Sequence, residues 1–299
     1  MKVRKQFYNR KNDYEKVFQL LIDTYQQGGK FCNWHPSRWE YMHFHSYYQD
    51  EFSEKSGVWE VDGKIVAIVH NELGEGEAFF TVHPDHTYLK PEMLAHAEEY
   101  LFKVEDGKKK LRVYGNDFDY ELNELFLNNQ FVRNEENLQY NTICFFDRIK
   151  PFPTIKLPEG FALRSLEENN DLVKVDRVQH RGFNHEGEPP EDGVKGRELM
   201  QSAPNFRKDL TIAVESPDGM FVSYVGMWLC QEKKVAYVEP VCTDPDFRNM
   251  GLGKAAVLES VRRCAELGAQ EVIVESSLPI YLSSGFVPSF IRYPWDKKY

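Results

Sequence analysis

The strongest chemical signal in the sequence is a glycine-containing turn that precedes an amphipathic helix. Residues 248–254 read Arg-Asn-Met-Gly-Leu-Gly-Lys, and apolar residues recur beyond them at helical spacing. The first turn of a helix exposes unpaired N–H groups and a partial positive charge, which suit a bound anion. Two glycines without Cβ atoms let the backbone approach a bulky phosphate closely. The turn therefore predicts a phosphate-binding site made by Arg248, Asn249, Met250, Gly251, Leu252, Gly253 and Lys254.

The same turn has two other interpretations. Residues 251–256 fit the dinucleotide fingerprint GxGxxG/A, and Glu275 ends the next predicted strand. In that fingerprint the glycine follows its strand directly, whereas residues 244–250 intervene here, and the predicted hairpins do not build a doubly wound sheet. A bound dinucleotide is therefore disfavoured. A tight loop with close helix packing is the interpretation that needs no ligand.

A predicted strand over residues 235–243 carries the next candidates. Period-2 alternation puts Tyr237, a pocket wall, and Glu239 on one face of this strand. Glu239 is a candidate general base that acts through water, provided that burial raises its pKa above the usual ~4.3. A substrate-binding carboxylate or a salt bridge explains Glu239 equally well. Pro240 cannot donate a ladder hydrogen bond, so we expect the strand to be interrupted or bulged there.

The elements that position these residues occur twice in the chain. Asp-Gly at 62–63 and at 218–219 separates strand-like runs and predicts a hairpin in each half. In the same order, residues 83–85 and 126–132 have counterparts at 244–246 and 281–287. A proline-containing stretch near residues 150–160 separates the halves. We therefore predict two similar α/β (α+β) domains, over residues 1–150 and 155–299, each with a mixed sheet flanked by helices.

The second half resembles the GNAT superfamily of acetyl-CoA-dependent N-acetyltransferases. Residues 248–253 match the family's diphosphate loop R/Q-x-x-G-x-G/A, and residues 241–247 before it are also typical. The family's late Tyr-x-x-x-Gly-Phe is met by Tyr281, Gly285 and Phe286. The resemblance covers about residues 160–290, and by extension the whole chain resembles tandem-GNAT proteins.

The resemblance implies a fold and a set of roles. The sheet of each domain would be mostly antiparallel and twisted, with splayed fourth and fifth strands. In the second domain these are residues 235–243 and 271–274, and the pantetheine arm of the cofactor would lie in the gap between them. Main-chain groups of Val241 and Thr243 would pair with that arm, and the N–H of Cys242 would polarise the thioester carbonyl. Tyr281 would be the general acid for the sulfur; its alternative role is a core aromatic that packs on Phe286.

The first half has the same order of predicted helices and strands as the second, but it lacks the residues of the cofactor site. Thr87, Lys90 and Glu92 stand opposite Arg248, Gly251 and Gly253, and Pro91 removes an N–H from the helix start. Phe126 and Gln130 replace Tyr281 and Gly285. A carboxylate at the helix start repels phosphate. We therefore expect a degenerate copy with no cofactor site.

Composition limits the remaining classes of function. The 299 residues carry a net charge of −10, which disfavours nucleic acid and anionic membranes as partners. We expect no signal peptide, because the basic residues at the start are not followed by a continuous apolar run, and no stretch approaches the ~18–20 apolar residues that a membrane span needs. Five scattered cysteines without CxxC indicate a reducing compartment, so we expect a cytoplasmic protein. His35, His43 and His45 lie among tryptophans and favour aromatic packing over a metal site.

The sequence thus predicts an N-acetyltransferase that moves an acetyl group from acetyl-CoA to a small-molecule amine by direct transfer in a ternary complex. The alternative is a non-catalytic module that binds or senses acyl-CoA, or binds a partner. The acceptor, the acyl chain and the oligomeric state are not specified by the sequence.

Overall fold

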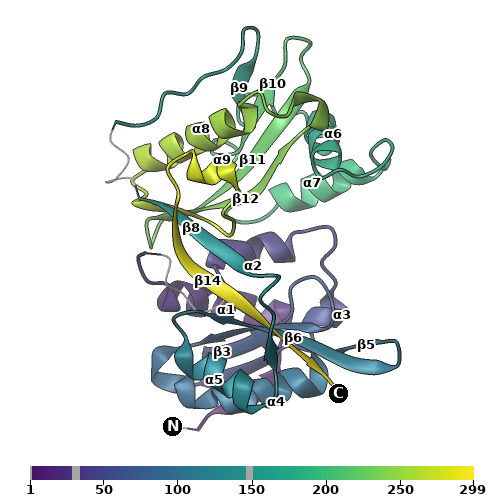
Figure 1. Cartoon of the computed structure of the whole chain (residues 1–299), viewed down its shortest axis with the longest axis vertical. Helices are drawn as coiled ribbons and strands as arrows, with labels where there is room; N and C mark the ends of the chain where they lie inside the picture. The colour runs from purple at the N-terminus through teal and green to yellow at the C-terminus, as the bar shows by residue number, and fades with distance from the viewer. Residues whose placement is uncertain (1, 29–33, 146–150) are drawn as a thin grey trace. The chain divides into compact units, whose positions relative to one another are not determined.

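The computed structural model describes residues 2–28, 34–145 and 151–299, and it divides into two compact units (Figure 1). The first unit consists of Met1–His43, Tyr47–Asn141 and Ser289–Tyr299. The second consists of Phe44–Ser46 and Thr142–Pro288. Each unit has its own strands and its own helices.

The sheet of the first unit has the strand order β1-β2-β3-β4-β6-β14, and β4 and β6 form its parallel pair. The strands are β1 (Arg4–Phe7), β2 (Gly57–Val61), β3 (Lys64–His70), β4 (Glu77–Val82), β6 (Lys108–Asn116) and β14 (Val287–Lys298), with the short β5 (Lys103–Glu105) and β7 (Val132–Arg133) on β6 and β14. The helices are α1 (Arg10–Thr24), α2 (Pro36–His43), α3 (Asp50–Ser53), η1 (Pro84–Leu89), α4 (Lys90–Tyr100) and α5 (Tyr120–Asn128).

Apolar side chains of the first sheet build one core on each face, and a register shift between β2 and β3 at Val66 lets Ile65 and Ile68 share a face although they are three residues apart. On β3, Ile65 and Ile68 pack with residues of α1 and α2, whereas Val66 and Val69 pack with residues of α4 and α5. Because side chains of a strand point alternately to the two faces, a strand buried on both sides reads as a continuous apolar run.

The second unit repeats this plan with the strand order β8-β13-β12-β11-β10-β9, and β12 and β13 form its parallel pair. The strands are β8 (Gln139–Phe145), β9 (Ala162–Ser165), β10 (Ile212–Glu215), β11 (Phe221–Cys230), β12 (Val235–Thr243) and β13 (Glu271–Val274). The helices are α6 (Leu172–Gly182), α7 (Gly193–Gln201), η2 (Pro245–Phe247), α8 (Leu252–Glu266) and α9 (Pro279–Leu282). One core lies under α8, and a smaller one lies under α6. The predicted mixed, mostly antiparallel sheets flanked by helices are confirmed.

The last strand of each sheet comes from the other half of the sequence. β8 follows α5 in the chain, yet it pairs with β13 of the second unit. β14 follows α9, yet it pairs with β6 of the first unit. The sequence repeat predicts that each half of the chain supplies every strand of its own sheet. In the structure the two halves exchange their last strands, so the compact units do not coincide with the two sequence repeats.

Two further findings bear on the remaining expectations. No helix in the described part of the chain is long and apolar enough to cross a bilayer. Cys144, Cys230, Cys242 and Cys264 are free thiols, and Cys32 lies outside the described residues.

Candidate active site

The two parallel strands of the second unit separate soon after they begin. β12 pairs with β13 from Val235 to Tyr237 and then continues to Thr243 along β11. Beyond Tyr237 no ladder joins β12 to β13 in the described second unit. The main-chain groups of Val241 on that side of β12 therefore have no strand partner among the described residues, whereas the Thr243 carbonyl accepts a bond from Arg248. The predicted splay is confirmed.

A bulge in β12 lies at the start of this separation. The pairing of β11 with β12 shifts between Val225 and Met227, so Gly226 faces both Glu239 and Pro240. A Cβ atom on Gly226 would lie 2.2 Å from the carbonyl oxygen of Glu239, which explains why glycine is needed at this close approach. The indole N–H of Trp228 donates to the same oxygen at 2.9 Å. The bulge predicted at Pro240 is confirmed.

The bulge changes which side chains face which core. Val238 packs in the core under α8, whereas Cys242 packs in the core under α6. In an uninterrupted strand two residues an even number apart would share a face. The extra residue therefore turns Val241 toward α8, and Thr243 with it, since its hydroxyl lies where a Cβ on Gly253 of α8 would be 3.0 Å away.

The hydrogen bonds between β11 and the end of β12 indicate where the main-chain groups of β12 point. The N–H of Asp244 donates to Val222 at 3.0 Å, and the carbonyl of Cys242 accepts a bond from Ser223 Oγ at 3.0 Å. Since such pairs alternate along an antiparallel ladder, the N–H of Cys242 points toward β11. The main-chain groups of Val241 and Thr243 point to the other side, where β13 has diverged. This direction does not favour the polarising role expected of the Cys242 amide, and that role stays a prediction.

The turn before α8 presents a row of unsatisfied amides. Gly251 caps the helix with a left-handed φ of 80° and no side-chain cap, and Asn249 has a φ of 64°. The first backbone bond of the helix runs from Ala255 to Gly251 at 3.0 Å. The N–H groups of residues 249–254 donate to no acceptor within the described chain. Residues 249–251 are exposed, and the first N–H groups of a helix have no partner within it, so this turn is suited to an anion that accepts several of them.

The two glycines of the turn serve different purposes. A Cβ atom on Gly251 would meet nothing within 4 Å, so open space lies in front of this residue. A Cβ on Gly253 would lie 3.0 Å from both Ile280 Cδ1 and Thr243 Oγ1. Gly251 therefore leaves room beside the amides, whereas Gly253 lets α8 pack closely on β12 and α9.

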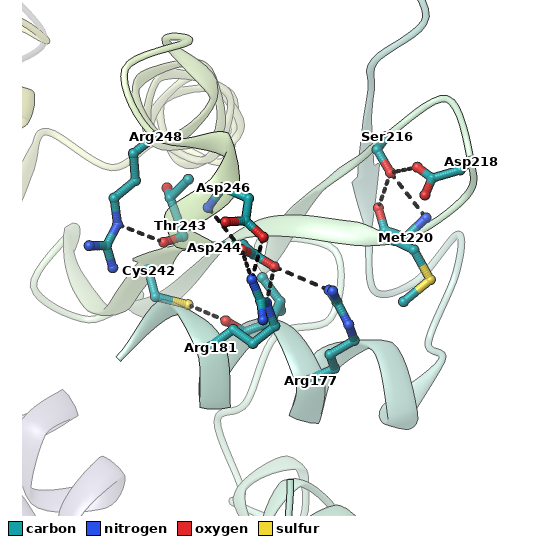
Figure 2. A network of polar contacts seen from close by, with 11 residues as sticks. Arg177, Arg181, Ser216, Asp218, Met220, Cys242, Thr243, Asp244, Asp246 and Arg248 are labelled. Atoms are coloured by element: carbon teal, nitrogen blue, oxygen red, sulfur yellow. Dashed lines mark hydrogen bonds and ion pairs between the residues drawn. The ribbon is translucent and has the colours of Figure 1, made fainter. Parts of the chain in front are cut away.

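Arg248 is turned toward the end of α6. Its Nε donates to the Thr243 carbonyl at 3.1 Å (Figure 2). Its Nη2 donates to the Gly182 carbonyl at 2.9 Å and to Asn184 Oδ1 at 2.8 Å. Lys254 forms no ion pair with the carboxylates of the described chain. Of the two cations that the sequence assigned to phosphate, Lys254 is thus the one without another partner.

A buried carboxylate anchors the other side of the turn. Asp244 has a fully buried side chain that accepts bonds from Arg181 at 2.6 and 3.0 Å and from Arg177 at 3.2 Å (Figure 2). Arg181 also pairs with the exposed Asp246 at 2.6 Å. Burial alone would raise the pKa of Asp244, but the bonds from Arg181 and the Asp246 amide and the charges of both arginines lower it below its usual value. Asp244 is therefore held as a carboxylate at neutral pH.

Tyr281 lies at the end of the short helix α9. Its buried ring packs on Phe286 with 5.7 Å between ring centroids, and the chain turns at Gly285, whose φ is 96°. The Phe286 N–H closes this turn on the Tyr281 carbonyl at 3.1 Å. The phenol hydroxyl bonds to no group in the described part of the chain. Burial raises its pKa, as do the nearby Glu239 and Cys242, so the proton stays on the phenol at neutral pH.

The comparisons with known proteins agree with this geometry. Residues 180–286 match the model of the acetyltransferase (GNAT) family, a range that runs from the end of α6 through the amide turn to Phe286. The chain is also 27% identical over 150 residues to a mycothiol acetyltransferase of Saccharomonospora viridis. That match covers 45% of this chain and 48% of the relative, so the chain spans about half the length of the curated relative it matches.

Solved structures extend the likeness in fold to the whole chain. A tandem GNAT protein from the clavulanic acid biosynthesis pathway covers 99% of this chain and 98% of its own, with a TM-score of 0.67 and 14% identity. A GCN5-related N-acetyltransferase from Sphaerobacter thermophilus covers 99% and 95%, with a TM-score of 0.63 and 14% identity. Residues 180–286 thus match a GNAT acetyltransferase domain, and the whole chain is similar in fold to a tandem GNAT protein. At these identities the solved structures show the fold alone.

The first GNAT-like unit has a different turn at the corresponding place. Lys90, the counterpart of Gly251, is buried and donates to Asp119 at 2.7 Å and to Glu121 at 2.8 Å. Pro91 is the second residue of α4, and Glu92 is in the first turn of this helix. An ammonium group held by two carboxylates, a missing N–H and a further carboxylate are all unfavourable for phosphate.

Aromatic rings pack where the parallel strands of the first unit diverge. β4 pairs with β6 only at Glu77–Arg112 and Ala78–Val113. The next side chains, Phe79 and Tyr114, stack with 4.4 Å between ring centroids, and Trp34 lies 4.4 Å from Phe79. These rings pack at the place in the first unit that corresponds to the divergence of β12 and β13 in the second.

The remaining sequence candidates have structural roles. His35 and His43 are buried among aromatic rings, and no cluster of three or more metal-binding side chains occurs in the residues that the structure describes. The sequence reasoning gave no role to Asp244, Arg181 or Gly226. Arginines one turn apart on α6 and an isolated glycine inside a strand were the available signals for them.

Proposed function

We propose that the second unit binds acetyl-CoA and transfers its acetyl group to a small-molecule amine in a ternary complex. The amides of residues 249–254 carry this proposal, because they have no acceptor in the described chain and lie next to the divergence of β12 and β13. A diphosphate is an anion with enough oxygen acceptors to satisfy them. The main-chain groups of Val241 and Thr243 would bind the pantetheine arm like an added strand.

The chemistry then needs a base and an acid. Glu239 accepts a proton from the amine, directly or through water, since an amine of pKa ~10 is mostly protonated at pH 7. The amine nitrogen bonds to the thioester carbon while the carbon–sulfur bond breaks. Tyr281 donates its proton to the departing sulfur. The raised pKa makes Tyr281 a weak acid, so we expect it to act by hydrogen bonding as the bond breaks.

The binding step is tested by titrating CoA into the protein in a calorimeter. Gly251→Glu places a carboxylate in the open space in front of the amides, and we expect it to abolish CoA binding. Glu266→Gln at the other end of α8 is the control, and its affinity should match the wild type. Unchanged affinity in Gly251→Glu would remove the diphosphate from this turn.

The chemical step is tested by thiol release from acetyl-CoA over a panel of amines. Tyr281→Phe keeps the ring on Phe286 and removes the hydroxyl, so we expect about 10²-fold slower turnover with unchanged CoA affinity. A wild-type rate would remove Tyr281 from the acid role. CoA binding without turnover for any amine would favour the non-catalytic acyl-CoA-binding alternative.

In this proposal the first unit is a degenerate copy that does not bind CoA. The bonds of Lys90 and the stacked Phe79 and Tyr114 support it. A single CoA site per chain in the calorimeter is the expected result, and two sites would contradict it.

A further inference from the structure

The side chain of Arg248 connects the amide turn to the segment that follows α6. Its three bonds, to Thr243, Gly182 and Asn184, have donor–acceptor distances of 3.1, 2.9 and 2.8 Å. A guanidinium that turned toward a phosphate would leave two carbonyls and an amide oxygen without this donor. Charge-assisted bonds of this kind are about twice as strong as neutral ones, so leaving them is costly.

The end of α6 is fixed in a defined position against β12. A Cβ atom on Gly182 would lie 2.6 Å from Cys242 Cβ, so the helix backbone contacts the strand directly. Asn184 ends the helix with a left-handed φ of 60°, and its N–H donates to Arg181 at 2.9 Å. Asparagine is among the few residues that adopt this conformation readily. The side chain of Asn184 is therefore held where Arg248 reaches it.

The connection to α7 starts at Asn184 and runs to residue 192. Near its start His185 donates its N–H to the His180 carbonyl at 3.1 Å, and the His180 ring lies 3.2 Å from the carbonyls of Glu186 and Gly187. The stretch leaves the helix at the residue that Arg248 holds. The first residue of this connection is therefore held in place by Arg248, which belongs to the amide turn.

We propose that Arg248 is a positioning residue that transmits occupancy of the amide turn to residues 184–192, and that it does not bind the phosphates. This proposal rests on the proposed function, which places CoA at the turn. A diphosphate bound to the amides of residues 249–254 would restrict the backbone next to Arg248. Its side chain would then hold Asn184 more firmly, and by linkage an ordered segment would favour CoA.

Hydrogen–deuterium exchange of the full chain tests this, with and without CoA, in wild type, Arg248→Gln and Asn184→Ala. In the free protein we expect both variants to raise exchange in residues 184–192 about fivefold or more, the lower end of typical coupling. In wild type, CoA should slow exchange both at residues 249–254 and at residues 184–192. In the variants only the first region should respond, with CoA dissociation constants within about threefold of wild type.

Arg262→Gln is the matched control, because Arg262 lies on α8 and bonds only to neighbours of its own helix in the described chain. It should behave as wild type in both regions. A loss of CoA affinity above tenfold in Arg248→Gln, with none in Asn184→Ala, would make Arg248 a phosphate ligand and overturn the proposal. Unchanged exchange of residues 184–192 in both variants would also overturn it.

The two proposals fail in different ways. If CoA does not bind the wild-type protein, the proposed function fails. The exchange of residues 184–192 in the free variants still decides whether Arg248 holds that segment.

Discussion

Replacing Asp244 with asparagine tests how much the buried carboxylate contributes to the second unit. The carboxylate accepts bonds from Arg181, Arg177 and the Asp246 amide. Asparagine has one acceptor oxygen, and its NH₂ group would face guanidinium donors. Removing one partner of a buried ion pair costs about 3–5 kcal/mol.

The exposure of the partners fixes where in this range the value falls. Asp244 has 0% of its side chain exposed, but Arg177 and Arg181 are 30% and 32% exposed. Their freed N–H groups regain water, so we expect a loss of about 3 kcal/mol. Asp246→Asn is the matched control, since Asp246 pairs with the same Arg181 at 2.6 Å but is 75% exposed. It should cost less than ~1 kcal/mol.

Urea unfolding followed by circular dichroism measures both variants. The pKa of Asp244 is lowered in the folded protein, so its contribution is complete above the usual value of ~3.9 and is lost as the pH falls through the folded pKa. The difference between wild type and Asp244→Asn should therefore be constant from pH 7 to pH 5 and should shrink in stronger acid. Equal losses in the two variants at pH 7 would refute the reasoning.

Three other expectations concern single positions. Gln130 has a φ of 66° at the turn that corresponds to Gly285, so Gln130→Gly should stabilise the first unit by about 1 kcal/mol, measured as a higher Tm; a lower Tm would contradict this. Trp228→Phe removes one bond to Glu239 and Trp295→Phe removes one to Asn123; each should cost about 1 kcal/mol in urea, and only Trp228→Phe should slow acetyl transfer. Burial raises the pKa of Cys144, Cys242 and Cys264 to about 12, so alkylation at pH 8 should be slow in the folded protein and fast in urea; fast labelling of the folded chain would show that these thiols are accessible.

The features that depend on local sequence could be predicted. The hairpins follow from Asp-Gly turns, and the bulge follows from Pro240, which has no N–H for the ladder. The turn and the start of α8 were predicted as well, because two glycines precede an amphipathic run of apolar residues. In each of these cases the residue type restricts the backbone within a few positions.

The features that depend on distant partners could not be predicted. Arginine suits a phosphate and a carbonyl equally well, so the sequence does not reveal that Arg248 bonds to Gly182 and Asn184. The face that Cys242 takes depends on a bulge whose exact register is set by Gly226 on another strand. The apolar pattern of a strand does not show which other strand it will pair with. For this reason the sequence did not predict that β14 pairs with β6.

The exchange of β8 and β14 determines what happens when the chain is divided into two fragments. A fragment that stops in the proline-containing stretch near residues 150–160 keeps β8 without β13 and exposes the edge of β6. Unpaired strand edges promote aggregation. Neither half would be a self-sufficient folding module, although two halves synthesised together have the pieces for mutual rescue. If the two halves arose by duplication of one domain, the exchange of strands has made each copy dependent on the other for folding.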